Sequence, residues 1–403
     1  MHFLFLNQFY PPDPAPTGRY LHDVARELVG RGHVVRVVCS RHAYATGEDL
    51  GRGAVHDGVD IHRVRGVPIG PASLAGRAAG HLAYLSRAAA HVLFHAPRPD
   101  LVLAATSPPF LGLVGAVASR WRRIPHAEWT MDVYPDVLQA HWTGQRSGLR
   151  RLLDRLARFQ LRRAALVVTL GTYMADRVAR YVARGTRVEA VPLWSDPAPD
   201  DAVSGNGWRA RRGWREDDLV LLYSGNMGRG HRFAEFLDAA RRLGPEGPVW
   251  AFVGGGPRRV EVERFQQEHP SARVQLLPAV APADVAASLR SGDVHLVSLA
   301  APWQGLIVPS KLPAAFAIGR PVIFVGPTQN EIAASITESG GGWVVGEGDL
   351  DGLIRAVDDA RDAVERARRG EAGRQYARVH FDRTRNIGRV ADLLEQTASG
   401  RQG

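Results

Sequence analysis

Lysine is almost missing from this chain. The 403 residues include 51 lysines and arginines, and Lys311 is the single lysine among them. Lysine carries a compact charge on a flexible stem, whereas arginine presents a planar fork of donors. A position that keeps lysine against this bias is a candidate for a site that needs the small ammonium group. Chance is the alternative, because one lysine has to fall somewhere.

Cysteine and long apolar runs are equally scarce. Cys39 is the one cysteine, which excludes an internal disulfide framework and any zinc site built from several cysteines. It ends the apolar run 34–38, so we expect a buried thiol. No apolar run reaches the roughly 18 residues of a membrane-spanning helix. The segment after Met1 lacks the basic flank of a signal peptide, so the cytoplasm is the expected location.

Acidic residues are fewer than basic ones, 41 against 51, which leaves a net charge of +10. This balance predicts an anionic partner, and a nucleotide sugar, a pyrophosphate lipid or a membrane surface would each satisfy it. Basic residues do not alternate with aromatic ones as they do on nucleic-acid surfaces, so we expect no nucleic-acid partner.

Short apolar runs alternate with amphipathic segments along the whole chain. Continuous apolar runs of this length are typical of buried parallel strands, and the alternation predicts an α/β architecture. In the first half the predicted strands are residues 2–7, 34–39, 60–64, 100–105, 126–130, 166–169 and 188–191. In the second half they are residues 219–224, 249–254, 274–277, 294–299, 321–326 and 343–345. The tail, residues 350–397, is predicted to be helical.

The two arrays are separated by a stretch rich in Pro, Asp and Gly at residues 197–213. They predict two doubly wound domains that face each other. We place the N-terminal domain at residues 1–200, the second domain at 201–380 and a final helix at 381–403. Because ligands bind at the carboxyl ends of such strands, we expect the functional motifs there and a catalytic cleft between the domains.

One motif places the lone lysine at the start of a helix. After the predicted strand 294–299 and a loop, Pro309-Ser310-Lys311 opens a helix that Gly319 closes. The free N–H groups at a helix start bind phosphate, and a cation there is unfavourable for the helix dipole unless an anion is present. We interpret Ser310 and Lys311 as a diphosphate site, with a surface lysine as the alternative.

Glycine-rich turns follow two other strands. Glycines let backbone amides approach a phosphate closely, and cationic side chains in the same turn would add charge. The first turn reads Gly225-Asn226-Met227-Gly228-Arg229-Gly230-His231, and the second reads Gly254-Gly255-Gly256. Such turns are common after strands, so each is a weak signal alone, and for the second we favour a simple connection.

Two loops of the first half also follow predicted strands. Residues 10–18 are interpreted as a long, stiff loop before the first helix and as part of the cleft wall. Its acceptor-side candidates are Pro16, Thr17 and Gly18. The second loop carries Asp132 and Asp136. Asp132 lies nearer the strand end and is the better candidate for touching substrate, whereas we expect Asp136 to serve a turn or a helix cap.

Residues 146–163 hold seven Arg and one Asp and predict a helix with an arginine stripe. A second stripe on this helix is apolar and consists of Leu149, Leu152, Leu153, Leu156 and Phe159. An apolar face beside a cationic face is what an anionic membrane surface selects. A helix that faces the core and leaves its charges in water is the alternative.

Taken together, these segments resemble retaining glycosyltransferases of family 4, in particular the bacterial branch that builds colanic-acid, O-antigen and capsule repeats. The likeness is carried by Pro11-Pro12-Asp13, Gly18-Arg19-Tyr20, Arg31-Gly32-His33, Tyr223-Ser224-Gly225-Asn226, Val308-Pro309-Ser310-Lys311-Leu312 and Gly319-Arg320-Pro321-Val322. It implies the GT-B fold, with the acceptor on the first of two facing Rossmann-like domains and the donor on the second. It also implies that the last helix crosses back to the first domain.

The resemblance implies transfer of a sugar, with retention, from a nucleoside-diphosphate sugar to an acceptor hydroxyl. A UDP-sugar donor and a glycan or lipid-pyrophosphate-linked acceptor are expected, as in surface polysaccharide assembly. Asp132 and Lys311 are the catalytic candidates. The donor-binding candidates are Gly225, Asn226, Gly228, Arg229, His231, Gly255, Val280, Ser310, Lys311 and Glu331. We expect no metal and no cofactor, because cations and backbone amides can stabilise the leaving diphosphate.

The chain also departs from the family pattern. Leu306 and Ala314 stand where many members carry two glutamates, Asn226 and His231 where an Arg and a Lys are usual, and Asp132 where a His is frequent. Glu331 matches a family Glu that resembles a ribose ligand, with an exposed residue at a helix start as the alternative. Two other functions stay open: transfer to a soluble natural product, and a catalytically silent protein that binds sugar nucleotides.

Overall fold

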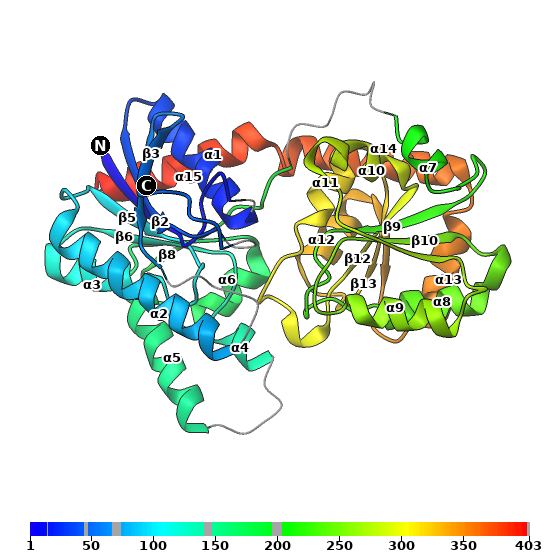
Figure 1. Ribbon diagram of the computed structural model, residues 1–403, viewed down its shortest axis with the longest axis horizontal. Helices are drawn as coiled ribbons and strands as arrows, with labels where there is room; N and C mark the ends of the chain where they lie inside the picture. The colour runs from blue at the N-terminus through cyan, green and yellow to red at the C-terminus, as the bar shows by residue number, and fades with distance from the viewer. Residues whose placement is uncertain (14, 44–46, 67–73, 141–146, 196–203, 401–403) are drawn as a thin grey trace. The chain divides into compact units, whose positions relative to one another are not determined.

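The computed structural model describes residues 1–403 except 14, 44–46, 67–73, 141–146, 196–203 and 401–403 (Figure 1). The chain divides into two compact units. The N-terminal unit comprises Met1–Pro192 and Thr384–Gly403, and the C-terminal unit comprises Leu193–Arg383. The first change of unit therefore comes before the predicted residue 200. Residues 206–210, which the sequence assigned to a linker, form a short helix instead, because Trp208 is buried in the second unit.

The N-terminal unit is built on an eight-stranded sheet with the order β3-β4-β2-β1-β5-β6-β7-β8. Its strands are β1 (His2–Leu6), β2 (Val34–Ser40), β3 (Gly53–His56), β4 (Val59–Val64), β5 (Leu101–Ala104), β6 (His126–Thr130), β7 (Leu166–Thr169) and β8 (Arg187–Ala190). All neighbours are parallel except β3 and β4. The sequence did not predict β3, because all four of its residues are exposed and form no apolar run.

Helices cover both faces of this sheet. They are α1 (Pro16–Gly30), α2 (Leu74–Ala90), α3 (Gly112–Arg122), α4 (Asp136–Ala140), α5 (Ser147–Leu161), α6 (Thr172–Ala179) and α15 (Arg383–Ala398), with a π-helical turn η1 (His91–His95) after α2. α1 and α15 lie on one face, and α2, α3 and α5 lie on the other (Figure 1). Arg31, just past α1, donates to Asp392 of α15 over 2.6 Å. The last helix therefore returns to the N-terminal unit.

The C-terminal unit has a six-stranded, all-parallel sheet with the order β11-β10-β9-β12-β13-β14. Its strands are β9 (Val220–Ser224), β10 (Val249–Val253), β11 (Val274–Leu277), β12 (Val294–Ser298), β13 (Val322–Val325) and β14 (Gly342–Val345). Its helices are α7 (Asn206–Ala210), α8 (Ala234–Leu243), α9 (Arg259–Glu268), α10 (Val285–Ser291), α11 (Lys311–Ala317), α12 (Glu331–Ser339), α13 (Leu350–Asp359) and α14 (Ala363–His380), with 3-10 turns η2 (Gly244–Glu246), η3 (Pro282–Asp284) and η4 (Ala301–Trp303). Every strand predicted here is present, since each is a buried apolar run.

The order of the strands locates the sites where ligands bind. In each sheet the direction of winding reverses once, between β1 and β5 in the first unit and between β9 and β12 in the second. Ligands of doubly wound sheets bind beyond the carboxyl ends of strands at such a switch point. The loop after β9 holds the first glycine-rich turn, and the segment after β12 leads to Lys311, so two predicted motifs meet at the second switch point.

An aromatic cluster makes the end of β9 rigid. Tyr223 and Phe233 pack edge to face with ring centres 4.9 Å apart, and both are buried against Phe252. Edge-to-face pairs add a directional preference to the burial of apolar area. The last residues of β9, where the candidate donor site begins, are therefore held in one position.

No helix of the described part of the chain is long and apolar enough to cross a membrane.

Candidate active site

Lys311 lies at the first residue of α11 and reaches back to the loop after β9. Its Nζ is 3.2 Å from Nε2 of His231 and 4.6 Å from the centre of the Tyr223 ring. The backbone oxygen of Asn226 is 3.5 Å away. The lysine therefore joins the two loops at the switch point.

The helix itself differs from the predicted phosphate cradle. α11 has only seven residues, and the side chain of Ser310 at its N-cap makes no capping hydrogen bond. Ser310 is exposed. What the structure supplies is a positioned ammonium group rather than a long helix with a strong N-terminal dipole. The role of Ser310 in holding a phosphate stays a prediction.

His231 holds the ammonium group in place. Its Nδ1 is 2.7 Å from the carbonyl oxygen of Ser298, so the ring donates there and leaves Nε2 free to accept from Lys311. Burial, followed by the positive charge of Lys311, lowers the pKa of His231 to about 3. The imidazole is therefore neutral at physiological pH and acts as an acceptor.

Burial also changes the charge of the lysine. It lowers the pKa of Lys311 to about 7, because the neighbours of Nζ are a neutral imidazole, an aromatic ring and a carbonyl oxygen. An anion that binds beside Nζ would restore the charged form. The site is thus matched to a ligand that brings its own negative charge.

Glycines bring three loops together around Lys311. Gly225 and Gly254 have φ values of 121° and 131°, which favour glycine, and a Cβ on Gly254 would lie 2.2 Å from the carbonyl oxygen of Gly225. A Cβ on Gly225 would lie 3.3 Å from Cε of Lys311. The amide of Met227 donates to Gly255 over 2.7 Å. The Gly254–Gly256 turn, interpreted from the sequence as a simple connection, thus packs directly on the first glycine-rich turn.

The other donor candidates differ in their burial and in the elements that carry them. Arg229 is exposed in the first turn, and Gly228 is half-buried beside it. Glu331 is half-buried at the first residue of α12, after β13, which is the neighbour of β12. The side chain of Val280 packs instead against the cluster that contains Trp208 and Trp214. The sequence missed Arg258, whose guanidinium holds the backbone oxygens of Arg229 and His231.

In the N-terminal unit, Asp132 follows β6 and lines a small pocket. Burial raises its pKa to about 6, so its carboxyl group takes up a proton more readily than an exposed aspartate. Other residues that line the pocket are Thr106, Phe110, Gly112, Glu128, Thr130, Tyr134 and Gln160. Asp136, expected at a turn or cap, lies in the first turn of α4, where it accepts from Tyr181 over 2.8 Å.

Glu128 is a second carboxyl group of this pocket, and sequence reasoning missed it. Burial raises its pKa to about 8, and its carboxyl group accepts a hydrogen bond from Nε2 of Gln160 over 3.3 Å. His126 lies 3.5 Å away on the same face of β6. α3 makes room for both side chains, because a Cβ on Gly112 would lie 2.3 Å from Oε1 of Glu128 and one on Gly115 would lie 2.4 Å from His126. The available signal was two ionisable residues alternating within a predicted buried strand.

The predicted loop at residues 10–18 is shorter than expected. Helix α1 begins at Pro16, so the acceptor-side candidates Pro16, Thr17 and Gly18 form its first turn. Proline suits this position because its missing N–H would have no partner within the helix. A Cβ on Gly18 would lie 2.7 Å from the backbone oxygen of Phe9, which explains why the helix can start so close to the loop.

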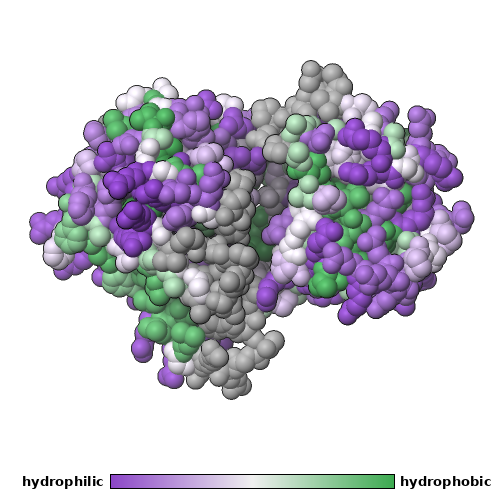
Figure 2. Space-filling model, viewed as in Figure 1, coloured by the Kyte–Doolittle hydropathy of each residue, from purple (hydrophilic) through white to green (hydrophobic). Residues whose placement is uncertain are grey.

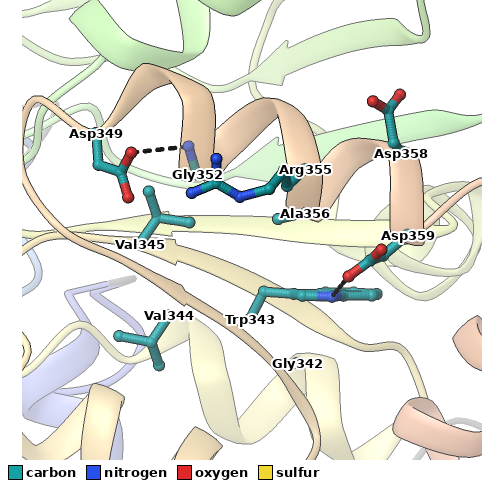
Figure 3. A pocket seen from close by; sticks show the side chains of 10 residues that line it. All are labelled: Gly342, Trp343, Val344, Val345, Asp349, Gly352, Arg355, Ala356, Asp358 and Asp359. Carbon is teal, nitrogen blue, oxygen red and sulfur yellow. Dashed lines mark hydrogen bonds between the residues drawn. The ribbon is translucent and has the colours of Figure 1, made fainter.

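A larger pocket of about 550 Å³ lies away from these residues, along the edge strand β14 and helix α13 (Figure 3). In it, Trp343 Nε1 donates to Asp359 over 3.3 Å, and Asp349 caps α13 through the amide of Gly352. Asp349 and Asp359 therefore have structural partners. None of the motif residues lines this pocket.

Profiles of two known families match the chain in succession. Residues 17–194 match the "Glycosyl transferase 4-like domain", and residues 218–362 match "Glycosyl transferases group 1". With two Rossmann-like sheets and this site, the fold and the matches define a glycosyltransferase of the GT-B class. The chain therefore carries a glycosyl transferase 4-like region followed by a glycosyl transferases group 1 region.

Relatives and solved structures agree with this assignment. The chain is 28% identical over 278 residues to the glycosyltransferase WbjE of Pseudomonas aeruginosa. The matched region covers 66% of this chain and 66% of WbjE. It is 26% identical over 172 residues to WcaI of Escherichia coli K12, a glycosyl transferase named for colanic acid biosynthesis, covering 41% of this chain and 42% of WcaI. The chain thus spans just under two thirds of the length of WbjE and less than half of the length of WcaI.

Two solved structures show the same fold. Sucrose-phosphate synthase from Thermosynechococcus elongatus superposes with a TM-score of 0.79 at 15% identity, covering 99% of this chain and all of that one. Anabaena Alr3699/HepE in complex with UDP superposes with a TM-score of 0.72 at 16% identity, covering 98% of this chain and 100% of that chain. At these identities the likeness concerns the fold alone.

Proposed function

We propose that this protein transfers a sugar from a nucleoside-diphosphate sugar, most simply a UDP-sugar, to a hydroxyl group of a glycan or lipid-pyrophosphate-linked acceptor. The transfer would proceed with retention, in surface polysaccharide or lipid-linked glycan assembly. The names of WbjE and WcaI and the UDP bound by the Anabaena protein support this choice. The observation that carries it is the contact of Lys311 with the neutral His231 at a switch point lined by glycines.

The difficult step of such a transfer is the departure of the diphosphate. Lys311 would stabilise the charge that develops there, together with Ser310, Arg229 and the amides of the turn from Gly225 to Gly230. His231 would position the ammonium group. The leaving phosphate can itself help to deprotonate the acceptor, so the proposal requires neither a carboxylate nucleophile nor a metal. Asp132, in the other unit, would position donor or acceptor.

The first experiment incubates the purified protein with a panel of UDP-, GDP- and dTDP-sugars and follows release of the nucleotide. We expect slow hydrolysis of one donor class. Lys311→Ala should lower that rate by about 100-fold or more, the usual effect of losing one such donor group. Arg264→Ala, a change at an arginine 74% exposed, is the matched control. Unchanged turnover and donor affinity in Lys311→Ala would remove the diphosphate assignment.

Lys311→Arg is the sharper variant, because it keeps the charge. Gly225 and the Tyr223 ring both lie close to the stem and head of Lys311. We therefore expect the wider guanidinium fork to remain impaired. A panel without any hydrolysis would favour the catalytically silent protein, and a lipid-acceptor assay would separate a membrane-linked acceptor from a soluble natural product.

We further propose that α5 holds the enzyme at the inner face of the plasma membrane. Three residues of its apolar stripe, Leu149, Leu152 and Phe159, are 36%, 51% and 37% exposed. These side chains therefore do not face the core of the unit. Figure 2 shows hydrophobic surface over α2 and α5. On α3, which packs against α5, Trp121 is 72% exposed, and tryptophan favours membrane interfaces.

Vesicles test this surface. The wild-type protein should sediment with anionic vesicles at low salt and less with neutral ones, because the arginines of α5 add electrostatic attraction. Leu152→Asp should abolish the apolar contribution, whereas Val379→Asp, at a residue 50% exposed in the other unit, should not. Equal retention of the two variants would show that α5 is an ordinary solvated helix.

A further inference from the structure

Three potential metal ligands converge at the turn between β3 and β4, in the N-terminal unit. His22 comes from α1, His56 ends β3, and Asp57 follows it in the turn. Nε2 of His22 is 3.1 Å from Oδ2 of Asp57, and Nε2 of His56 is 3.9 Å from the same oxygen. All three ligand atoms lie within 4.8 Å of one another. We propose that this cluster binds a divalent transition-metal ion of the zinc type.

The spacing fits such an ion with small movements. In a tetrahedral zinc site with bonds of about 2.0–2.1 Å, neighbouring ligand atoms are about 3.4 Å apart. The contact between His22 and Asp57 is already near this value, and that between His56 and Asp57 needs to shorten by about half an ångström. The ligand atoms of the two histidines lie within 4.8 Å of each other, so His56 must also move toward His22. The side chains of His56 and Asp57 are 56% and 41% exposed, so they can make this adjustment. Water would complete the coordination.

The buried ligand, His22, is oriented by a contact of its second ring nitrogen. Oη of Tyr10 is 2.9 Å from Nδ1 of His22, and Tyr10 is buried. When Nδ1–H donates to this oxygen, the lone pair of Nε2 points toward Asp57 and His56. Histidine ligands of metals are commonly fixed in this way through their second nitrogen. Burial lowers the pKa of His22, which favours the neutral, ligating form at physiological pH.

The turn is held against α1 independently of any ion. Asp57 and Gly58 have φ values of 51° and 76°, the conformation of a tight hairpin turn that presents Asp57 toward the helix. A Cβ on Gly58 would lie 2.7 Å from Cγ1 of Val29 in α1, so turn and helix are in close contact. The ligands therefore come from two elements that packing has already brought together.

One cation competes for the same carboxylate. Nε of Arg26 is 3.2 Å from Oδ2 of Asp57, and the Arg26 side chain is 54% exposed and free to swing into water. Without a metal, the cluster would be an ordinary network of one Asp, one Arg and two His. Removal of Arg26 therefore has opposite effects in the two cases. If the cluster binds a metal ion, the removal should strengthen metal binding, whereas it can only weaken a simple ion-pair network.

An ion here would clamp the β3–β4 hairpin to α1 and to the segment that carries Tyr10. Lys311 belongs to the other unit, so the inference does not depend on the proposed transfer reaction. Failure of the metal experiment would leave the glycosyltransferase proposal untouched, and the reverse also holds.

The test uses the full chain after treatment with a chelator, dialysed against Zn²⁺, with Co²⁺ as the spectroscopic probe. We expect one tight equivalent and a visible Co²⁺ absorption band. Asp57→Asn tolerates the left-handed backbone but loses the carboxylate, so it should bind at least tenfold more weakly, as should His56→Ala. Arg26→Ala should bind more tightly than wild type.

The matched control is His95→Ala, which removes an exposed histidine from a separate ring stack with His91. It should leave binding unchanged. Tyr10→Phe should weaken binding about tenfold, as loss of an outer partner usually does, while circular dichroism confirms folding. Wild-type affinity in both His56→Ala and Asp57→Asn, or an equal loss in His95→Ala, would overturn the site.

Discussion

At the scale of the residue, the lone lysine acts through its neighbours more than through its own helix. Lys311 has a pKa of about 7 because its charge is buried beside the neutral His231. The protonation state of Lys311 at neutral pH therefore depends on whether an anion is bound beside it. That dependence gives a measurable signature that an ordinary surface lysine lacks.

The first prediction concerns proton uptake at Lys311. Above pH 7 the free protein holds this lysine neutral, and UDP should bind the charged form, so each UDP bound takes up a proton. The affinity for UDP should consequently fall as pH rises from 7 to 9. Titration calorimetry in buffers of different ionisation enthalpy measures the uptake directly. Lys311→Arg stays charged and should take up no proton; equal uptake in both proteins would contradict the assignment.

The second prediction concerns Glu128, whose pKa is raised from 4.5 to about 8 by burial. Between these values the folded state keeps a proton that the unfolded state loses, so the free energy of unfolding falls as pH rises. The slope is at most about 1.4 kcal/mol for each pH unit. Denaturant unfolding at pH 6.5, 7.2 and 7.9 should show it in the wild type.

The variant Glu128→Gln has no group to titrate there and should lose this part of the slope. Both proteins keep His126, whose pKa burial lowers to about 3, so the contribution of this histidine to the slope cancels in the comparison. Parallel stability curves for the two proteins would show that Glu128 is already ionised in the folded state.

At the scale of the element, sequence patterns predicted the strands whose side chains are buried. Each buried apolar strand was found, because short continuous apolar runs are typical of buried parallel strands. The exposed strand β3 was missed for the opposite reason, since its pairing with β4 supplies hydrogen bonds but no apolar pattern. The start of α1 was placed too late, because proline marks both loops and first helical turns.

The candidate site was predictable only in part for a related reason. Lys311 and the first glycine turn have local signals, whereas the partnership of Lys311 with His231 joins residues 80 positions apart. Arg258 gave no local motif, and Glu128 gave only the alternation of two ionisable residues within β6. Their roles depend on which loops the sheet brings together. The order of the strands in the sheet cannot be predicted from any single segment of the sequence.

The third prediction tests the contact between the two glycine turns. Gly254→Ala places a Cβ 2.2 Å from the Gly225 oxygen at φ 131°, so both loops must move. We expect a loss of about 1–3 kcal/mol from backbone strain, with further loss from the clash, and weaker UDP binding. Gly346→Ala is the control, because nothing lies within 4 Å of a Cβ on Gly346, which is no donor-binding candidate. Thermal unfolding and UDP titration of the two variants should therefore differ clearly.

At the scale of the whole molecule, the chain builds two cores and divides the candidate groups between them. Asp132 and Glu128 belong to the N-terminal unit, while Lys311 and the glycine turns belong to the C-terminal unit. The last helix is an exception to chain order, because α15 completes the first unit after the second has formed. A change in α15 should therefore affect the part of the protein that lies furthest from it in sequence.

The last prediction uses Leu394, which is completely buried in α15. Leu394→Ala should cost about 2–5 kcal/mol, the usual effect of a cavity in a core. Because α15 belongs to the N-terminal unit, amide hydrogen exchange should accelerate in β1 and β5 and stay unchanged in β9 and β12. UDP affinity should also stay unchanged, since Lys311 and its partners lie in the other unit. The control is Arg389→Ala, which removes only a surface ion pair with Glu189 and should cost less than about 1 kcal/mol. Faster exchange in both sheets of Leu394→Ala would instead mean that the two units unfold as one cooperative body.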